Sequence, residues 1–172
     1  MFRSTAGAGG TAYNSSFPEF GSGGGSGGSR FSAASPFGAF GGNGGGVIEI
    51  VAASFIINGK ISANGNNGNG QGLIYGTGAG GSGGGIYLIS TRDTIINTGN
   101  LEAKGGNGAY PGCGVNPGTI NGQCPAGGGG GGGRIKIEAV SITGTPVVMG
   151  GVSGSNFNGS PGSNGVFTFI AL

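Results

Sequence analysis

Apolar and polar residues alternate in short runs along this chain, and glycine-rich stretches separate the runs. Three of them read VIEIVA, IYLIST and RIKIEA and begin near residues 47, 86 and 134, and a fourth, VFTFIAL, begins near 166. A period of two, with many β-branched residues, is typical of β-strands that bury one face. No stretch of ten residues shows a helical period, and this density of glycine disfavours helices. The pattern predicts an all-β chain with essentially no α-helix.

A longer repeat surrounds these runs. The three copies read GGGVIEIVAASFIINGKISANG from Gly44, GGGIYLISTRDTIINTGNLEAKGG from Gly83 and GGGRIKIEAVSITGTPVVMGG from Gly131. In each copy a second short strand (FII, TII, SI) and then a third (KISA, NLEA, PVVM) follow the first. Three short strands in about twenty residues match one coil of a parallel β-helix. We therefore predict a short right-handed parallel β-helix, or β-solenoid, with coils starting near residues 47, 86, 134 and 166.

The copies also predict which side chains form the core. Equivalent residues of successive coils should stack about 4.8 Å apart. The alignment predicts a core stack of Ile50, Ile89 and Ile137, and a second of Ile57 and Ile96. It also places Asn58 and Asn97 at equivalent turns, where asparagine tolerates a left-handed backbone and its amide bonds the next coil.

The glycine runs organise the rest of the chain. We expect one domain over residues 1–172, with an irregular, aromatic and glycine-rich part over 1–43 and three to four coils over 44–172. A glycine run precedes the first strand of every copy. Two interpretations remain open: polyproline-II-like segments that hydrogen-bond side by side, or irregular excursions without fixed structure.

Composition excludes several classes of protein. The 172 residues include 49 glycines, yet no glycine-every-third pattern, so collagen is excluded. Charged residues are only 7%, and dense apolar runs argue against a disordered chain. The net charge of +2 comes from scattered residues, so we expect no nucleic-acid partner. No apolar stretch is long enough for a membrane helix, so we expect no membrane span.

Candidate catalytic chemistry is sparse. The chain has no histidine and five acidic residues, of which Asp93 adjoins Arg92 as in a surface ion pair. Glu49 and Glu138 alternate with apolar residues and are expected to face outward, with Lys136 at the position equivalent to Glu49. The glycines at 76, 78 and 81 resemble a dinucleotide fingerprint, but a strand rather than a helix follows them. We expect no enzyme, cofactor or metal site.

Two cysteines and two sequons indicate where the chain resides. Cys113 and Cys124 lie in one proline-containing loop, and a local disulfide is the simplest interpretation, with free thiols or a metal site as alternatives. A disulfide would imply an oxidising compartment. Asn14 and Asn158 begin sequons that could carry glycans if the chain passes through a eukaryotic secretory pathway. We expect an extracellular or cell-surface protein.

The strings INGKISANG, INTGNLEAKGGNG and GGGGGGGRIKIEA resemble the repeats of glycine-rich, pectin-lyase-like β-helix proteins. The resemblance covers roughly residues 44–172. It implies a parallel β-helix of the type found in large secreted or surface proteins of microbes and protists, where adhesive or scaffold-forming roles are inferred. A shared fold does not determine a role.

The leading functional hypothesis is a structural subunit that assembles with itself into a filament or surface layer. The strand VFTFIAL has no polar cap, and exposed end coils of a solenoid predict either head-to-tail stacking into a fibre or excision from a longer protein. Aromatic residues could contact a neighbouring subunit or fill an irregular first coil, and the candidate assembly contacts are Phe17, Phe20, Phe37, Phe40, Phe167 and Phe169. The alternative is an adhesin that binds surface glycans through the loop over 109–126. Ice binding is less favoured, because Thr143 and Thr145 form the only Thr-x-Thr motif on a strand-like segment.

Overall fold

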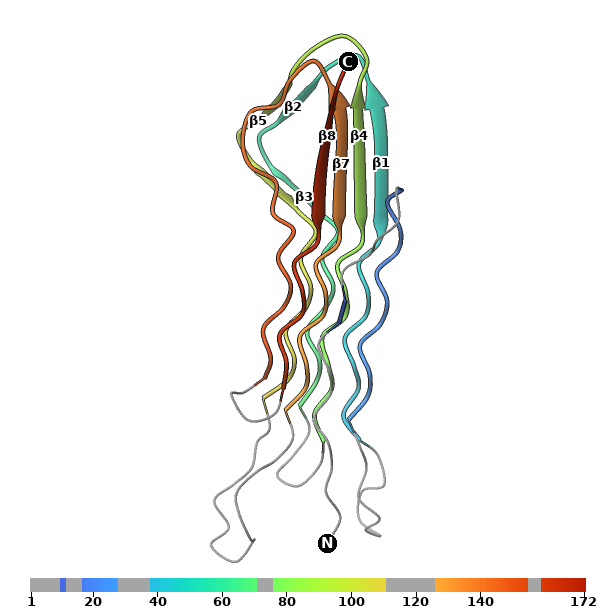
Figure 1. The fold of residues 1–172 in the computed structure, drawn as a ribbon, viewed down its shortest axis with the longest axis vertical. Coiled ribbons are helices and arrows are strands. Elements are labelled where there is room, and N and C mark those ends of the chain that lie inside the picture. The colour runs from blue at the N-terminus through green and yellow to red at the C-terminus, as the bar shows by residue number, and fades with distance from the viewer. Residues whose placement is uncertain (1–9, 12–16, 28–37, 71–75, 111–125, 155–158) are drawn as a thin grey trace, which may run out of the picture.

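The molecule is elongated, with short β-strands at one end and glycine-rich segments running along its length (Figure 1). The computed structural model describes residues 10–11, 17–27, 38–70, 76–110, 126–154 and 159–172. Its regular elements are all strands, and no helix occurs in these ranges. The prediction of an all-β chain is therefore confirmed. Since there is no helix among these residues, there is also none that could cross a membrane.

Three parallel sheets surround the core on three sides (Figure 1). The largest has the order β1 (Val47–Ala52), β4 (Gly85–Ser90), β7 (Arg134–Ala139) and β8 (Val166–Ala171). The other two pair β2 (Phe55–Ile57) with β5 (Ile95–Asn97), and β3 (Lys60–Ser62) with β6 (Asn100–Glu102). The third repeat continues these smaller sheets only by single bridges, from Ile142 to Ile95 and from Val147 to Glu102.

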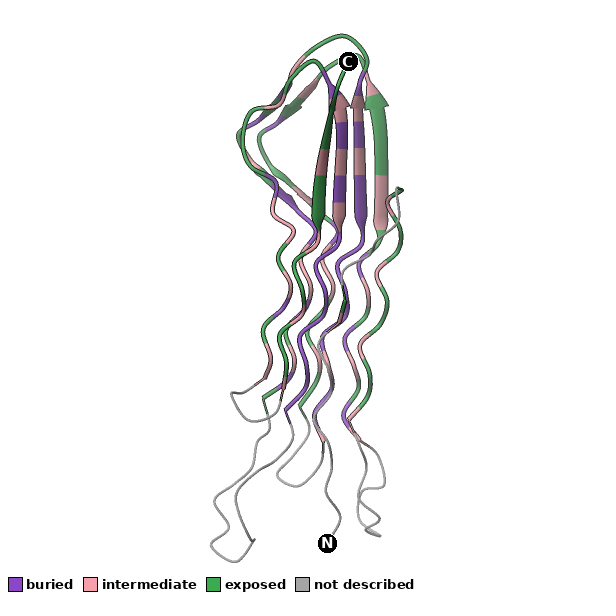
Figure 2. Cartoon of the chain, viewed as in Figure 1, coloured by how far each residue is buried: buried purple, intermediate pink, exposed green. Residues whose placement is uncertain are grey.

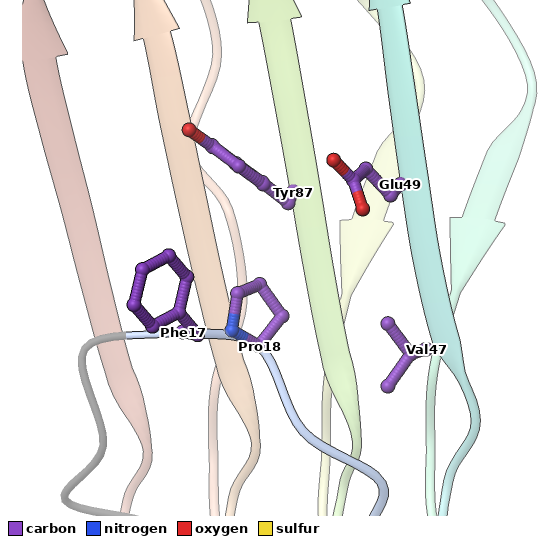
Figure 3. Close-up of a pocket in the computed structure, with 5 residues that line it drawn as sticks. All are labelled: Phe17, Pro18, Val47, Glu49 and Tyr87. Carbon is purple, nitrogen blue, oxygen red and sulfur yellow. The ribbon is translucent and has the colours of Figure 1, made fainter.

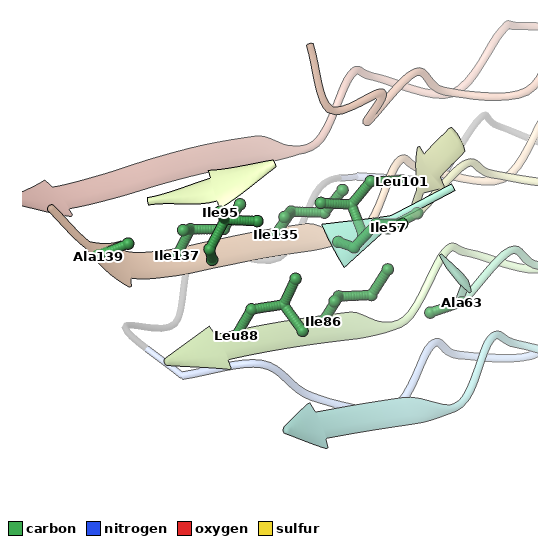
Figure 4. Close-up of a cluster of buried hydrophobic side chains, with 10 residues drawn as sticks. Ile57, Ala63, Ile86, Leu88, Ile95, Leu101, Ile135, Ile137 and Ala139 are labelled. Atoms are coloured by element: carbon green, nitrogen blue, oxygen red, sulfur yellow. The ribbon is translucent and has the colours of Figure 1, made fainter. Parts of the chain in front are cut away.

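The core lies inside this three-sided end of the molecule. Alternate residues of β4 and β7 are fully buried, as the colouring of these strands in Figure 2 shows. Figure 4 shows them meeting side chains of β2, β5 and β6; the fully buried large apolar residues are Ile86, Leu88, Ile95, Leu101, Ile135 and Ile137. Each contributes about 1.5–3 kcal/mol through removal of apolar area from water. This small cluster holds the strands in register.

The pairing of β1 with β4 differs by one residue from the sequence alignment. Ile50 pairs with Leu88, which pairs with Ile137, so these three form the inward stack. Ile89 instead lies between Val51 and Glu138 on the outward face, and its place in the predicted stack was wrong. The alignment treated all three glycines from Gly83 as preceding the strand, whereas the third glycine is the first residue of β4.

A contact with a distant part of the chain explains why β4 begins with a glycine. Gly85 is on the outward face of the sheet, opposite Val47 and Arg134. A Cβ built on Gly85 would overlap the ring of Pro18, which crosses the sheet there. Glycine at this strand position therefore makes room for a segment 67 residues earlier, as Gly85 and Pro18 are numbered.

The second predicted stack also shifts. Ile57 pairs with Asn97, while Ile96 pairs with Ile56 and is 42% exposed. The stacking of Ile57 on Ile96 was therefore wrong, and the asparagine ladder is absent, because Asn58 accepts a hydrogen bond from the Thr98 hydroxyl at 2.8 Å.

A longer corner in the second repeat causes this shift. Residues 53–54 connect β1 to β2, whereas residues 91–94 connect β4 to β5. The buried Ser90 hydroxyl holds the longer corner, because it lies 2.8 Å from the Asp93 carbonyl oxygen and 3.0 Å from that of Ala53. The extra residues move every later position of this repeat relative to the first.

The glycine-rich segments are bonded to one another laterally. In segment 76–84 the backbone N–H groups donate in turn to three different neighbours, at 2.7–3.0 Å. Gly78, Gly81 and Gly84 donate to segment 63–69; Ala79 and Ser82 donate to segment 22–25; Gly80 and Gly83 donate to segment 128–131. The N–H groups that donate to the same neighbour are thus three residues apart, which is the period of a polyproline II helix. Within the described ranges, the glycine runs are ordered segments rather than irregular excursions.

Glycine is required where these segments pack on all sides. A Cβ on Gly80 would overlap the carbonyl group of Gly106, and one on Gly130 would overlap that of Gly81. By contrast, nothing lies within 4 Å of a Cβ built on Gly25 or Gly46. At positions such as these the neighbouring backbones approach so closely that a side chain is excluded.

Exposed side chains also occur on the two bundle segments that lead into the edge strands β1 and β8. Phe40 and Asn43 are exposed on segment 39–45, which precedes β1, and Pro161 and Asn164 are exposed on segment 159–165, which precedes β8. We call residues 22–27, 39–45, 63–70, 76–84, 103–110, 126–133, 147–154 and 159–165 the glycine bundle.

Candidate functional site

The outward face of the four-stranded sheet carries a compact polar cluster. Register places Glu49, Tyr87, Lys136 and Thr168 in one row across β1, β4, β7 and β8. The Tyr87 hydroxyl donates to Glu138 at 2.5 Å, and the Lys136 ammonium lies 2.8 Å from the same carboxylate oxygen. The ammonium also sits 4.6 Å from the centre of the Tyr87 ring. Tyr87, Lys136 and Glu138 therefore act as one unit, which we call the outer triad.

Mutual contacts set the protonation of the outer triad. The Lys136 ammonium and the Tyr87 hydroxyl both lower the pKa of the Glu138 carboxyl, the lysine having the larger effect. Hydrogen bonding to Glu138 raises the pKa of Lys136 and that of Tyr87. At neutral pH the cluster is thus an ionised acid–lysine pair with a neutral phenol. Such a unit stabilises its own charges and has no group poised to exchange a proton.

A segment from the N-terminal part of the chain covers part of this face. Phe17 and Pro18 cross in front of the sheet (Figure 3). The Lys136 ammonium lies 5.6 Å from the Phe17 ring centre. A hollow of about 270 Å³ lies beside them. Its lining residues are Phe17, Pro18, Val47, Glu49 and Tyr87. The Glu49 carboxylate makes no hydrogen bond or ion pair with any residue that the structure describes.

A second charged cluster lies at the third side of the core. Glu102 on β6 binds Lys60 at 2.8 Å through one oxygen and Lys104 at 2.8 Å through the other, and the Asn64 amide donates at 3.1 Å. Lys104, Lys60 and Asn64 together lower the pKa of Glu102 to about 2. Lys60 comes from the first repeat and Glu102 from the second. The cluster therefore ties two neighbouring repeats together.

The acidic residues of these clusters are occupied in structural pairing. Glu138 and Glu102 lie in different sheets, so they do not face each other across one site. Arg92 and Asp93 are exposed at the corner after β4, and no ion pair joins them in the structure. The backbone carbonyl of Asp93 instead accepts a hydrogen bond from the Ser90 hydroxyl. Among the described residues, no group of three acid, cysteine or histidine side chains converges as a metal site would require.

The two ends of the four-stranded sheet expose apolar side chains. β1 and β8 each have one neighbouring strand, so each presents a free edge in the described part of the chain. Residues that continue the inward stacks are uncovered there: Ile50 is 38% exposed on β1, and Phe167 and Phe169 are 39% and 38% exposed on β8. Their counterparts Leu88 and Ile137 are fully buried. Both ends of the sheet therefore leave apolar side chains of the inward rows partly uncovered.

The structure places the other predicted contact residues as follows. Phe17, Phe20 and Phe40 are exposed, at 65%, 74% and 66%. Phe37, the cysteines Cys113 and Cys124, and the sequon residues Asn14 and Asn158 lie outside the described residues, as does most of the loop over 109–126. Disulfide pairing and glycosylation therefore stay predictions.

The alignment of the repeats predicted that Lys136 and Glu49 share a row, but it did not predict the outer triad. Lys136 does lie in the row of Glu49, as the alignment predicts. However, Tyr87 stands between them, and the lysine pairs with Glu138 on its own strand. The alternation Lys136, Ile137, Glu138 was the available signal, because residues two apart on a strand share a face. The Glu102 cluster had no such signal, since it depends on the pairing of β3 with β6.

No family model matches this sequence, and the searches of curated proteins and of solved structures found no match either.

Proposed function

We propose that the chain is a short right-handed parallel β-helix, or β-solenoid, with polyproline-II-like glycine segments, and that it serves as a non-catalytic extracellular structural protein. In this proposal it is a subunit of a filament or surface layer and assembles through the exposed ends of its sheet. Parallel strands that pair in register across three repeats support the fold, as does the three-residue period of lateral hydrogen bonds. Glu138 of the outer triad and Glu102 are both engaged in ion pairs with lysines, which supports a structural role.

The exposed apolar ends carry this proposal. Ile50 at one end and Phe167 and Phe169 at the other continue the rows that are buried elsewhere in the sheet. A free parallel edge with an apolar inner face is a template for a further strand. Burial of such a face against another molecule would gain about 25 cal/mol per Å² of apolar area. Self-association is therefore the interaction that the described surface favours best.

Electron microscopy with sedimentation velocity tests the proposal. We expect the purified chain to form regular assemblies whose size grows with concentration. The variant Phe167→Ser/Phe169→Ser should remain dispersed, while the control Phe20→Ser, which changes an exposed phenylalanine outside the strands of the sheet, should assemble normally. Monomers at every concentration would contradict the proposal. A circular dichroism spectrum matched to the wild type excludes misfolding of the serine variant.

The hollow beside Tyr87 favours a second candidate, an adhesin that binds surface glycans. Aromatic rings from Phe17 and Tyr87 border it, and the unpaired Glu49 carboxylate offers acceptors for hydroxyl groups (Figure 3). Concave sites with aromatic walls and a few polar groups are typical of small-ligand sites. A glycan array probed with wild type and with Phe17→Ala tests this role. Binding that depends on Phe17 would support the adhesin, and no binding would exclude it for the glycans on the array.

A further inference from the structure

We infer that a second molecule of this chain adds its β1 to the free edge of β8, parallel and in the register of the existing sheet, so that Val47 lies opposite Val166, Ile48 opposite Phe167 and Glu49 opposite Thr168. This inference rests on the proposed self-assembly and specifies the contact that produces it.

The register of the sheet supports this alignment. Val47, Gly85, Arg134 and Val166 form one continuous row, and each later row continues in the same way. All four strands are parallel, and their inward and outward faces coincide. A β1 added beside β8 is therefore the next member of the same series. A shift by one residue would turn the apolar inward residues outward.

The inward faces match in chemistry. Phe167 and Phe169 on β8 lie over Ile135 and Ile137 on one side and are partly uncovered on the other. In the inferred register they meet Ile48 and Ile50 of the second molecule. Ile50 is 38% exposed, so both partners have apolar area to bury. Pairs of aromatic and β-branched residues on neighbouring strands are favourable.

The outward faces match in charge. Arg134 makes no ion pair with any described residue, and its Nε is buried without a hydrogen-bond partner. Its guanidinium leans toward β8, where Nη2 lies 3.4 Å from the Thr168 hydroxyl. In the inferred register Glu49 of the second molecule lies beside Thr168, about 4.8 Å from it across the strands. Arg134, on the strand next to the β8 edge, thus meets Glu49 from the β1 edge, and neither residue has an ion-pair partner among the described residues.

The glycine bundle is expected to contribute fewer hydrogen bonds to this contact than the sheet. Gly80 donates to Gly128, and Gly129 at the next equivalent position donates to Ser160. The following member of this series is Pro161, which has no backbone N–H. Phe40 is 66% exposed on segment 39–45, which leads into β1. The missing donor at Pro161 limits lateral hydrogen bonding on this side of the bundle, so we expect the sheet to supply most of the contact.

Cysteine pairs test the register. In Val47→Cys/Val166→Cys the thiols lie on facing positions of neighbouring strands, within the range that a disulfide spans. We expect mild oxidation to produce a ladder of covalent oligomers on a non-reducing gel. The offset pair Val51→Cys/Val166→Cys and each single variant should give at least tenfold less. The native cysteines are present in every variant, so any bonds that they form appear equally in the controls.

Charge exchange tests the pairing of Arg134 with Glu49. Glu49→Lys and Arg134→Glu should each raise the concentration needed for assembly by about tenfold, and the double exchange should restore it, because each contact contains one residue of each kind. Failure of restoration, or an offset pair that cross-links as well as the in-register pair, would overturn the inferred contact even if assemblies form. A chain that stays monomeric in every experiment would overturn the proposed function itself.

Discussion

The Cα of Gly80 faces the backbone carbonyl of Gly106 so closely that a side chain at residue 80 would overlap it. We predict that Gly80→Ala lowers the free energy of unfolding by about 3 kcal/mol, because the neighbouring backbone has to move and lateral hydrogen bonds are lost. Thermal unfolding followed by circular dichroism measures this change.

The matched control is Gly46→Ala, since nothing lies within 4 Å of a Cβ at that position. We expect this variant to be neutral or more stable by about 0.5 kcal/mol, because alanine restricts the unfolded chain. Equal stability of the two variants would show that the bundle is not packed as described.

The register correction predicts unequal effects of two isoleucine truncations. Ile137 is fully buried, whereas Ile89 lies on the outward face. We expect Ile137→Ala to lower the free energy of unfolding by about 2–5 kcal/mol through loss of burial and creation of a cavity. Ile89→Ala should cost about 1 kcal/mol or less. Urea denaturation compares them, and a larger loss for Ile89→Ala would restore the original alignment.

Asn97 offers a stabilising substitution. Its side chain is buried on β5 opposite Ile57, and its Oδ1 accepts no hydrogen bond in the structure. A buried polar atom without a partner costs about 1–3 kcal/mol. We therefore predict that Asn97→Val raises the free energy of unfolding by about 1 kcal/mol, measured by urea denaturation. A loss of stability would mean that the amide has a role beyond the contacts seen here.

The Glu102 cluster predicts acid sensitivity. The lysines and Asn64 lower the pKa of Glu102 to about 2 from an ordinary value of 4.5, so the folded state favours the ionised form. The resulting stability is present above about pH 5. It is lost as the pH falls from 4.5 toward 2. We expect it to be about 1 kcal/mol, because solvent screens the partly exposed lysines.

The variant Glu102→Gln tests whether this stability comes from the charge of the Glu102 carboxylate. The variant should be less stable than the wild type at pH 6, and the difference should disappear near pH 2. Glu19→Gln, which changes an exposed acid outside the cluster, should leave the pH dependence of unfolding as it is in the wild type. Chemical denaturation at a series of pH values gives both curves. A constant difference for Glu102→Gln across the series would assign the stability to packing rather than to charge.

Local patterns were sufficient to predict the type and approximate place of the strands. Alternation in VIEIVA and RIKIEA marks strands whose inward residues are apolar, and the structure places β1 and β7 there. The spacing of the copies also placed Lys136 in the row of Glu49. These features depend on neighbours within one strand or on equivalent strand starts, and both can be read from the sequence.

The register of the second repeat could not be predicted in this way. It depends on Pro18 lying over Gly85, and on Ser90 holding a longer corner. The first is a contact between distant parts of the chain, and the second shifts Asn97 into a row that apolar periodicity assigns to isoleucine. For the same reason the Glu102 cluster was not foreseen, since Lys60 and Glu102 meet only after β3 pairs with β6.

The glycine bundle has a thermodynamic consequence for the whole molecule. Its segments are held by amide hydrogen bonds, so their unfolding exposes mainly polar backbone. Apolar exposure raises the heat capacity by about 0.45 cal/mol/K per Å², whereas polar exposure lowers it by about 0.26. The heat capacity of unfolding should therefore be small for a chain of 172 residues. A small value flattens the dependence of stability on temperature, so cooling should weaken this protein less than one held mainly by an apolar core.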